Sequence, residues 1–316
     1  MPKTTEYTST APTTYADPIN VGEVEDDERP DWIGASAFIG VHLACLMAFY
    51  TGVSWAAAAM FVFTYTIRMF GITGVFHRYF AHRTYKTSRV FQFVLAWLGT
   101  SSAQQGPLWW AAHHRHHHRH SDEPEDIHSP IQKGFFWSHV GWIMCKKYEP
   151  TNVKAIPDFA KYPELRFLNN FHILPPIAFA LAVYGFGTLL AHFAPGLHTN
   201  GFQMLVWGFF ISTTLLYHCT FCINSLAHVV GWRRFDTNDH SRNNFFLAVL
   251  TLGEGWHNNH HRCPYSERQG FYWWEIDMSH YILRGLAWLG LVWDLQKPPQ
   301  SIYLEAEKNQ QAQPAA

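Results

Sequence analysis

Residues 171–222 decide the fold, and they read FHILPPIAFALAVYGFGTLLAHFAPGLHTNGFQMLVWGFFISTTLLYHCTFC. Two apolar stretches, 171–193 and 202–222, flank a short connection that contains Pro195, Gly196 and Gly201. Neither stretch contains an Asp, Glu, Lys or Arg. Each is close to the ~20 residues that a helix needs to cross the hydrocarbon core of a bilayer. The segment therefore predicts a helical hairpin that spans a membrane.

A second pair of apolar stretches lies nearer the N-terminus. Residues 33–50 carry no charged side chain, and residues 55–73 carry only Arg68, with a minimal turn at Thr51-Gly52 between them. We therefore expect an all-α integral membrane protein with four transmembrane helices in two hairpins, over about 33–50, 55–73, 171–193 and 202–222. Buried helices of a large soluble protein are the alternative, but tight uncharged turns in both hairpins favour membrane spans.

The composition agrees with a membrane protein. Of 316 residues, 48% are hydrophobic and 17% aromatic. Only 15% are charged, which is below the roughly 25% of soluble domains. The formal charge of −1 argues against a nucleic-acid-binding protein, which needs an excess of Lys and Arg. Five cysteines without an even, spaced framework exclude a secreted disulfide scaffold.

The distribution of basic residues predicts the orientation. Residues 74–169 hold twelve Lys and Arg, whereas the turns 51–54 and 194–201 hold none. By the positive-inside rule, both chain ends and the long middle segment face the cytoplasm. The apolar stretches 90–110 and 281–293 have polar interruptions and predict amphipathic helices at the membrane surface. The polar ends, 1–30 and 301–316, are expected to be solvated tails.

Histidine is the unusual residue of this sequence, with 21 copies. His257, His260 and His261 have the spacing HxxHH, which places all three on one face of a helix. The tract from His113 to His120 offers the same spacing in two registers, and spacing alone does not choose between them. These registers are His114, His117 and His118, or His113, His116 and His117.

Two further motifs carry histidine near the ends of the expected spans. His77 and His82 are five residues apart, so they point to different sides of a regular helix and need a helix end or a distortion to act together. Asn224 and His228 are four residues apart and share a face. All of these motifs lie on the side of the membrane that is expected to be cytoplasmic.

So many imidazoles exceed the needs of one four-coordinate zinc ion. They suit two divalent ions, for which iron, copper and zinc are all admissible. A metal-bound imidazole usually donates its other N–H to an acceptor. The carboxylates near the clusters in sequence are Asp122, Asp126, Asp239 and Glu254, and ordinary surface solvation is the alternative role for each.

At these residues the sequence resembles the membrane fatty acyl desaturases, and most closely the stearoyl-CoA (Δ9) desaturases. The matching strings are Gly71-Ile-Thr with His77-Arg and His82-Arg, Trp110-Ala with His114-Arg and His117-His118, GFFWSHVGW at 134–142, Asn224-Ser with His228, and GEGWHNNHH at 253–261. They stand in uninterrupted order, and the resemblance implies one fatty acyl desaturase domain over 31–300.

The resemblance implies a cytoplasmic helical cap that carries a di-iron site, with O₂ as co-substrate. It also selects a register for the tract, because Trp110 stands four residues before the first ligand of the second motif. Carried over position by position, the iron ligands are His77, His82, His114, His117, His118, His228, His257, His260 and His261, with Asn224 holding a metal-bound water.

The activity that the resemblance implies is the insertion of a cis double bond, Δ9 in the most similar group, into a saturated long-chain acyl-CoA. Unsaturated fatty acids for membrane lipids would be the product. Trp110 is a candidate to contact the substrate. Tyr65 and Met69 are candidates to close the far end of an acyl tunnel, and simple packing of the bundle is their alternative role.

The carrier of the acyl chain is less well defined by the resemblance. Lys146 and Lys147 match basic positions associated with CoA phosphates, although basic residues beside a membrane also suit anionic lipids. The stearoyl-CoA enzymes have an Arg-Asp pair where this chain has Ala112-His113. A phospholipid-bound or carrier-bound acyl chain is therefore the alternative to acyl-CoA.

Electrons for the implied reaction are expected from a separate protein. The sequence contains no His-Pro-Gly-Gly haem motif of a fused cytochrome b5 domain. The expected donor is a ferredoxin, a rubredoxin or cytochrome b5 with its reductase.

Two other functions share some of these features. A di-iron hydroxylase of alkanes or fatty acids begins with the same hydrogen abstraction, but the strings NSxxH and GEGxHNxHH favour a desaturase. A histidine-rich metal transporter should carry ionisable residues within its spans. The expected spans hold Arg68, a few His and no Asp or Glu, which argues against transport.

Overall fold

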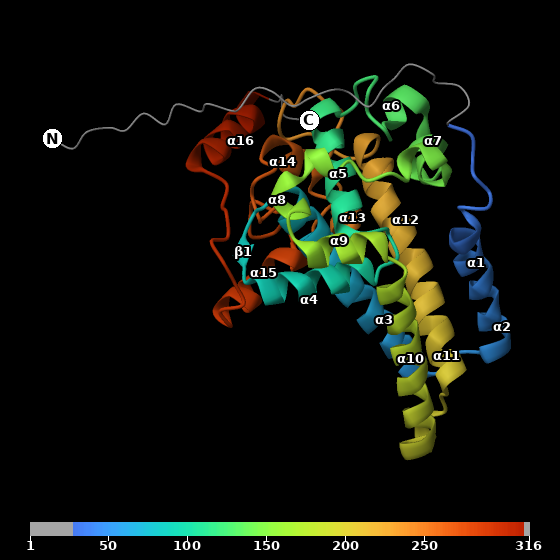
Figure 1. Ribbon diagram of the computed structural model, residues 1–316. Coiled ribbons are helices and arrows are strands. Elements are labelled where there is room, and N and C mark those ends of the chain that lie inside the picture. The colour runs from blue at the N-terminus through green and yellow to red at the C-terminus, as the bar shows by residue number, and fades with distance from the viewer. Residues whose placement is uncertain (1–27, 313–316) are drawn as a thin grey trace.

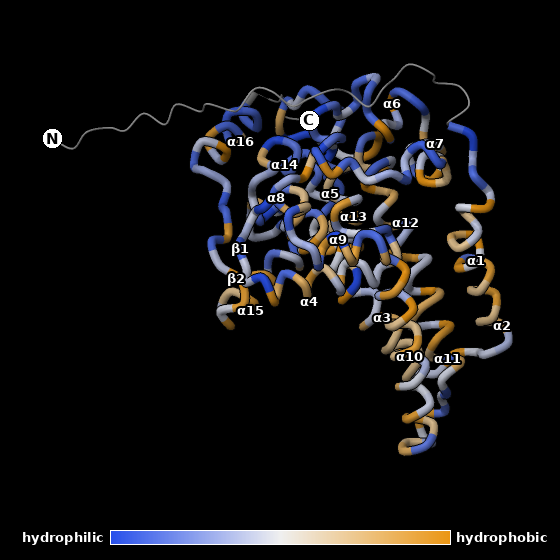
Figure 2. Tube along the Cα trace, in the orientation of Figure 1, coloured by the Kyte–Doolittle hydropathy of each residue, from blue (hydrophilic) through white to orange (hydrophobic). Residues whose placement is uncertain are grey.

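The computed structural model describes residues 28–312, and almost all of their regular structure is helical. Long helices project from one side of a broad helical cap (Figure 1). These helices are mostly hydrophobic, whereas hydrophilic segments gather on the opposite side of the cap (Figure 2). The predicted N-terminal tail, 1–30, lies almost entirely outside the described residues.

Within residues 28–312, three helices are long and apolar enough to cross a membrane, judged by length and composition. They are Trp55–Ala81, Leu174–Phe193 and Gly201–His228. The first joins α3 (Trp55–Phe70) to the π-helical segment η2 (Gly71–Ala81), and the second is α10 (Leu174–Phe193). The third joins α11 (Gly201–Leu205), the π-helical segment η7 (Val206–Ile211), α12 (Ser212–Asn224) and the short 3₁₀ helix η8 (Leu226–His228).

The connection between α10 and α11 explains why a glycine begins the third helix. α10 and α11 lie side by side (Figure 1). A Cβ at Gly201 would lie 2.7 Å from the carbonyl oxygen of Tyr184, too close for any larger residue. The side chain of Asn200 caps the new helix by accepting a hydrogen bond from Gln203 N at 2.9 Å. The hairpin expected from residues 171–222 therefore forms.

The stretch expected to be the first span is shorter than predicted. Residues 36–51 are helical, as α1 (Ser36–Ala44), a 3₁₀ turn at 45–47, and α2 (Ala48–Thr51). At 1.5 Å per residue they extend only about 24 Å, less than the ~30 Å of a bilayer core. The helix stops at Gly52 because this residue has a φ of +59°, which glycine adopts readily.

Arg68, the only charged residue of α3, is completely buried. Its guanidinium donates to Thr213 Oγ1 at 2.7 Å and to Ser212 Oγ on the third helix. It also lies 4.7 Å from the centre of the Phe179 ring. These hydroxyl groups and the aromatic ring stabilise the buried guanidinium inside the bundle. They also link α3 to α12 and α10.

The cap contains most of the remaining elements. Its helices are α4 (Arg89–Thr100), α5 (Pro107–His120), α6 (Pro130–Lys133), α7 (Phe135–His139), α8 (Pro157–Ala160), α9 (Pro163–Asn170), α13 (Phe245–Leu250), α14 (His257–Arg262) and α15 (Met278–Trp288). Two short antiparallel strands, β1 (Lys86–Thr87) and β2 (Val292–Trp293), join its distant parts. α4 and α15 lie across the direction of α10, at the edge of the cap from which the long helices leave (Figure 1).

The amphipathic stretch predicted over 90–110 is not one helix. α4 ends at Thr100, and α5 begins only at Pro107. Proline has no N–H to donate, so it starts a helix more readily than it continues one. Ala103 and Gln105 in the break have positive φ values, which a helix does not allow.

The C-terminal prediction of a solvated tail is wrong for 301–312. Residues 300–312 form α16 (Gln300–Ala312), which packs on the cap. Ile302 and Ala306, four residues apart, are buried against Phe235 and Phe271. An ion pair between Glu305 and Arg262 and a hydrogen bond from Asn309 Nδ2 to Arg234 O also hold this helix on the cap.

Candidate metal centre

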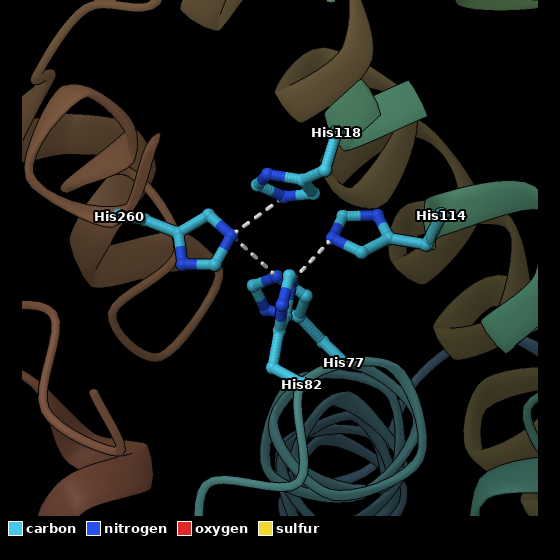
Figure 3. A group of neighbouring side chains, drawn as sticks. All are labelled: His77, His82, His114, His118 and His260. Atoms are coloured by element: carbon cyan, nitrogen blue, oxygen red, sulfur yellow. Dashed lines mark hydrogen bonds between the residues drawn. The ribbon is translucent and has the colours of Figure 1, made fainter. Parts of the chain in front are cut away.

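The structure gathers all nine predicted ligand histidines at the centre of the cap, in two groups. In each group the candidate ligand atoms lie within 4.8 Å of one another. The five-histidine group consists of His77, His82, His114, His118 and His260 (Figure 3). The four-histidine group consists of His117, His228, His257 and His261.

A distortion at the end of the first long helix brings His77 and His82 into the same group. His77 lies in the π-helical segment η2, and His82 is the residue at which that segment ends. His82 N donates to His77 O at 3.1 Å, the i→i+5 bond of a π-helix. The five-residue spacing, which a regular helix would separate, therefore places both rings side by side.

The two HxxHH helices each supply both groups. On α5, His114 and His118 join the five-histidine group, and His117 joins the four-histidine group. His113 and His116, which the alternative register requires, belong to neither group. His113 Nδ1 instead donates to Trp109 O at 2.9 Å, and His116 Nε2 donates to Glu125 O at 2.9 Å.

On α14 the division is reversed. His260 enters the five-histidine group, whereas His257 and His261 enter the four-histidine group. Each HxxHH motif thus places histidines of one helix in both neighbouring groups.

The distances between ring nitrogens fit metal ions better than hydrogen bonds. His260 Nε2 lies 2.9 Å from both His77 Nε2 and His118 Nε2, and one proton cannot serve both contacts. His82 Nε2 lies 3.0 Å from His114 Nε2. Nitrogens bound to one ion at about 2.1 Å and at right angles are roughly 3 Å apart. The five-histidine group therefore has the spacing of a ligand shell.

The four-histidine group shows the same signs. His228 Nε2 lies 3.0 Å from His257 Nε2. Within the described part of the chain, the buried His261 Nε2 has no hydrogen-bond partner. A buried nitrogen without a partner is costly, and a metal ion would satisfy it. The donor set of both groups therefore fits divalent ions bound through nitrogen.

All four carboxylates selected from the sequence contact Nδ1 of candidate ligand histidines. Asp122 accepts from His228 Nδ1 at 2.8 Å, and Asp126 from His117 Nδ1 at 3.0 Å. Asp239 accepts from His261 Nδ1 at 2.5 Å, and Glu254 contacts His77 Nδ1. Each bond leaves Nε2 of that ring free for a metal and fixes the orientation of the ring.

Burial keeps most of the imidazoles neutral, as metal ligands must be. Burial, reinforced by neighbouring imidazoles, lowers the pKa of His82, His114, His118, His257 and His260 well below the usual value. His117 is different: burial opposes its charge, but the Asp126 carboxylate raises its pKa. The same contact outweighs burial at Asp126 and holds its pKa well below the usual range.

Two adjoining cavities meet at the metal groups. A small one of about 30 Å³ is lined by Met69, His257 and Asn224, among others. A larger one of about 450 Å³ runs between α1, α10 and α12. The residues that line both cavities are Trp110, His114, Thr220 and Asn224. Asn224 thus lines both cavities together with His114.

Of the predicted substrate contacts Trp110, Met69 and Tyr65, the first two line at least one of the two cavities and the third lines neither. Trp110 stacks on His114 with ring centres 4.9 Å apart, and Met69 lines the small cavity. Tyr65 lines neither of these two cavities, and its hydroxyl donates to Leu250 O at 2.6 Å.

Lys147 is already engaged by an acidic residue. Its ammonium lies 2.9 Å from Glu28, which also binds Lys133 at 2.7 Å and the Tyr148 hydroxyl at 2.8 Å. Burial alone would raise the pKa of Glu28, but these partners lower it to about 2. Lys146 is exposed.

Sequence reasoning missed the residues that brace Glu254. Arg78 is completely buried and pairs with Glu254 at 3.1 Å and with Asp277 at 2.9 Å. Gln269 Nε2 donates to Glu254 at 3.0 Å. A charged residue directly after His77 in an apolar helix was a signal for Arg78, whereas nothing in the sequence singles out Gln269.

Apolar helices of membrane length, joined to a cap with two carboxylate-backed histidine groups, define a membrane-type protein with a candidate dinuclear metal centre. The fatty acid desaturase family model matches residues 53–293. The chain belongs to the fatty acid desaturase family, and it is therefore an oxidoreductase.

Three relatives show the range of this family. An sn-1 stearoyl-lipid 9-desaturase of Anabaena variabilis is 37% identical over 83% of this chain and 92% of its own length. A Delta-9 acyl-lipid desaturase of Arabidopsis thaliana is 37% identical over 87% of this chain and 86% of its own length. An acyl-CoA 5-desaturase of Anemone leveillei is 36% identical over 83% of this chain and 78% of its own length.

Proposed function

We propose that this protein introduces a cis Δ9 double bond into a saturated long-chain acyl chain that is esterified to a membrane lipid. The observation that carries the proposal is a largely apolar cavity lined by His114 of the five-histidine group, which adjoins the small cavity lined by His77 and His257. Two irons held there would supply, with O₂, two electrons and two protons, the oxidant that removes two hydrogens from adjacent methylenes while two waters form.

The residues around the irons have separate tasks in this proposal. The nine histidines hold the ions, the four carboxylates orient the rings, and Asn224 holds a metal-bound water. Trp110 positions the chain where the cavities meet, and Met69 limits its far end. Each buried methylene contributes roughly 0.8 kcal/mol, so a long chain is held mainly by its length. The buried surroundings exclude water from the reaction.

The family resemblance suggests acyl-CoA, but three observations favour a lipid-linked chain. Two of the three relatives described above are acyl-lipid enzymes by name. The ion pair with Glu28 occupies Lys147, one of the expected CoA-phosphate contacts. The larger cavity lies between α1 and α10, lined by Phe38, Val41 and Ile177, at the level of apolar helices. This position among apolar helices suits an acyl chain that enters from the bilayer.

The proposal includes a membrane topology. The helix at 36–51 serves as a fourth, shorter span, and the protein is one desaturase domain over 31–300. Both chain ends and the metal centre face the cytoplasm, in keeping with the twelve basic residues of 74–169. Electrons come from a separate ferredoxin, rubredoxin or cytochrome b5 with its reductase.

The test is fatty-acid analysis of a desaturase-deficient host that expresses this protein or its His261→Ala variant. We expect a new Δ9 monounsaturated acid with the wild type and none with the variant. His198→Ala is the matched control, because His198 is exposed in the connection before α11. Hydroxylated products, or no product when a compatible electron donor is supplied, would overturn the proposal.

The carrier is tested with purified protein, using liposomes of a stearoyl lipid in one assay and stearoyl-CoA in the other. Conversion of the lipid without its prior hydrolysis supports the lipid-linked substrate. Conversion of stearoyl-CoA alone would leave the desaturase proposal in place and overturn the assignment of the carrier.

A further inference from the structure

A tryptophan in the lining of the larger cavity has a buried indole N–H that lacks a partner. Trp142, on the short 3₁₀ helix η3 (Gly141–Met144), is buried with 5% of its surface exposed, and it lines this cavity. Among residues 28–312, nothing accepts a hydrogen bond from its Nε1. Indole can only donate, so the natural partner of this group is an oxygen acceptor.

Other tryptophans of the protein show that this is unusual. Trp109 Nε1 donates to Tyr148 O at 2.7 Å, Trp137 Nε1 to Ile127 O at 2.9 Å, and Trp256 Nε1 to Ile276 O at 2.9 Å. Buried indole N–H groups normally find such partners. Trp142 is also held firmly, because its ring stacks on Trp109 at 5.8 Å with an angle of only 6°.

A second unpartnered nitrogen lines the same cavity. His128 Nδ1 is buried and has no hydrogen-bond partner among the described residues. The nearest carboxylate oxygen, Asp126 Oδ1, is 3.8 Å away, beyond hydrogen-bonding distance. The rings of His128 and Trp142 are 5.1 Å apart. Two unpartnered ring nitrogens therefore lie close together and mark a polar recess, in a cavity whose lining also includes Gln104 and Gln105.

We propose that Trp142, with His128 beside it, binds the carbonyl oxygen of the acyl substrate and thereby determines which C–C bond lies at the metal centre. The inference rests on the proposed desaturase function and names the group that recognises the head of the chain. The methylenes of an acyl chain are nearly identical, so apolar walls alone let the chain slide by one carbon. A hydrogen bond at the carbonyl fixes the register. An ester and a thioester offer the same oxygen.

The test uses Trp142→Phe, which removes the N–H and keeps an aromatic ring. Trp137→Phe is the matched control, because Trp137 lies in the same part of the cap, lines neither cavity, and donates to a backbone carbonyl. We expect Trp142→Phe to produce double bonds at more than one position and to raise KM about five- to tenfold, the loss expected for one hydrogen bond. The control should keep one position.

A binding measurement separates recognition from turnover. Inhibition by an octadecanoyl ester is compared with inhibition by the matching octadecyl ether, which lacks the carbonyl oxygen. The wild type should prefer the ester about five- to tenfold, and Trp142→Phe should lose this preference. His128→Phe provides a second variant should Trp142→Phe fail to fold. An unchanged ester preference and an unchanged double-bond position in both variants would overturn the proposal, with the recess then serving only to hold a water.

Two further comparisons separate the sources of failure. Parallel assays with stearoyl lipid and stearoyl-CoA show whether the carbonyl belongs to an ester or a thioester, because the variant should lose selectivity toward the true substrate. If the wild type forms no double bond with either substrate, the proposed function fails. If the wild type is active and Trp142→Phe behaves like Trp137→Phe, only the carbonyl site fails.

Discussion

A carboxylate that accepts a hydrogen bond from Nδ1 of a candidate ligand histidine holds that ring in one orientation. Asp239 is typical, since it accepts from His261 Nδ1 at 2.5 Å and is itself bound by Ser241 and Thr237. The chain of hydrogen bonds positions His261 Nε2 toward the other three members of its group. At the scale of single residues, the candidate site therefore depends on side chains outside the two histidine groups.

Replacing Asp239 should weaken metal binding without unfolding the cap. Asp239→Asn keeps the size of the side chain but removes the charge, and the expected loss of metal affinity and desaturation is about 10–100-fold. The measurements are iron per protein after purification and product formed per hour. Asp236→Asn is the control, because Asp236 lies three residues away with a fully exposed side chain. Equal iron content in both variants would contradict the role of Asp239.

The buried neutral imidazoles predict how the metal-free protein responds to acid. The pKa of at least five ligand histidines is lower in the folded protein than the ordinary 6.5. The unfolded chain therefore binds more protons below pH 6.5, and the free energy of unfolding should fall as the pH decreases through that value. The melting temperature of the metal-free protein in detergent should be lower at pH 5.5 than at pH 7.5. The opposite order would show that these rings are charged in the folded protein.

At the scale of elements, the site depends on a close crossing between η2 and α4. A Cβ at Gly71 would lie 3.0 Å from Gly99 Cα and 3.1 Å from Leu98 O. The two backbones approach this closely because both positions are glycine. The crossing supports the π-helical segment that carries His77.

A larger side chain at this crossing should push α4 away from η2. Gly71→Leu is expected to lower the free energy of unfolding by about 1–3 kcal/mol and to reduce desaturation, because His77 moves. Gly185→Leu in α10 is the control, since a Cβ there meets nothing within 4 Å. The readouts are thermal stability in detergent and product formation. If both variants lose the same stability, the effect comes from leucine itself and the crossing is unimportant.

At the scale of the whole molecule, the long helices separate the α10–α11 connection from the cap (Figure 1). A small tag inserted at Gly196, which has open space around it, should be accessible only from the side opposite the cytoplasm. A tag at the exposed Asp236 in the cap should be accessible only from the cytoplasm. Labelling of sealed, oriented vesicles measures both. Accessibility of both tags from one side would contradict the proposed topology.

Much of this architecture could be predicted because local composition determines it. Uncharged stretches of about 20 residues predict helices that span a membrane. The HxxHH spacing predicts that three histidines lie on one helical face. The five-residue spacing of His77 and His82 even required a distortion, and η2 supplies it. These inferences need only the period of a helix and the polarity of its residues.

Other features depend on contacts between distant segments. The division of ligands into groups of five and four depends on how α5 and α14 face each other, which no spacing reveals. The docking of α16 depends on Phe235 and Phe271, far away in the sequence. The helix at 36–51 begins three residues later than its apolar composition suggested, because residues 32–35 form a turn in which Asp31 accepts from Ile33 N and Ala35 N. Contacts between segments determine the grouping of the histidines and the docking of α16, and the residue pattern of a single segment does not reveal such contacts.

The sharing of α5 and α14 between the two histidine groups has a consequence for metal loading. An ion bound in either group would immobilise both helices, because these helices carry six of the nine candidate ligands. Most of the conformational entropy that these helices lose on metal binding is therefore lost when the first ion binds, and little remains to be lost when the second ion binds. The two sites should therefore fill together, so that protein under limiting iron divides into fully loaded and empty molecules, with few half-filled ones.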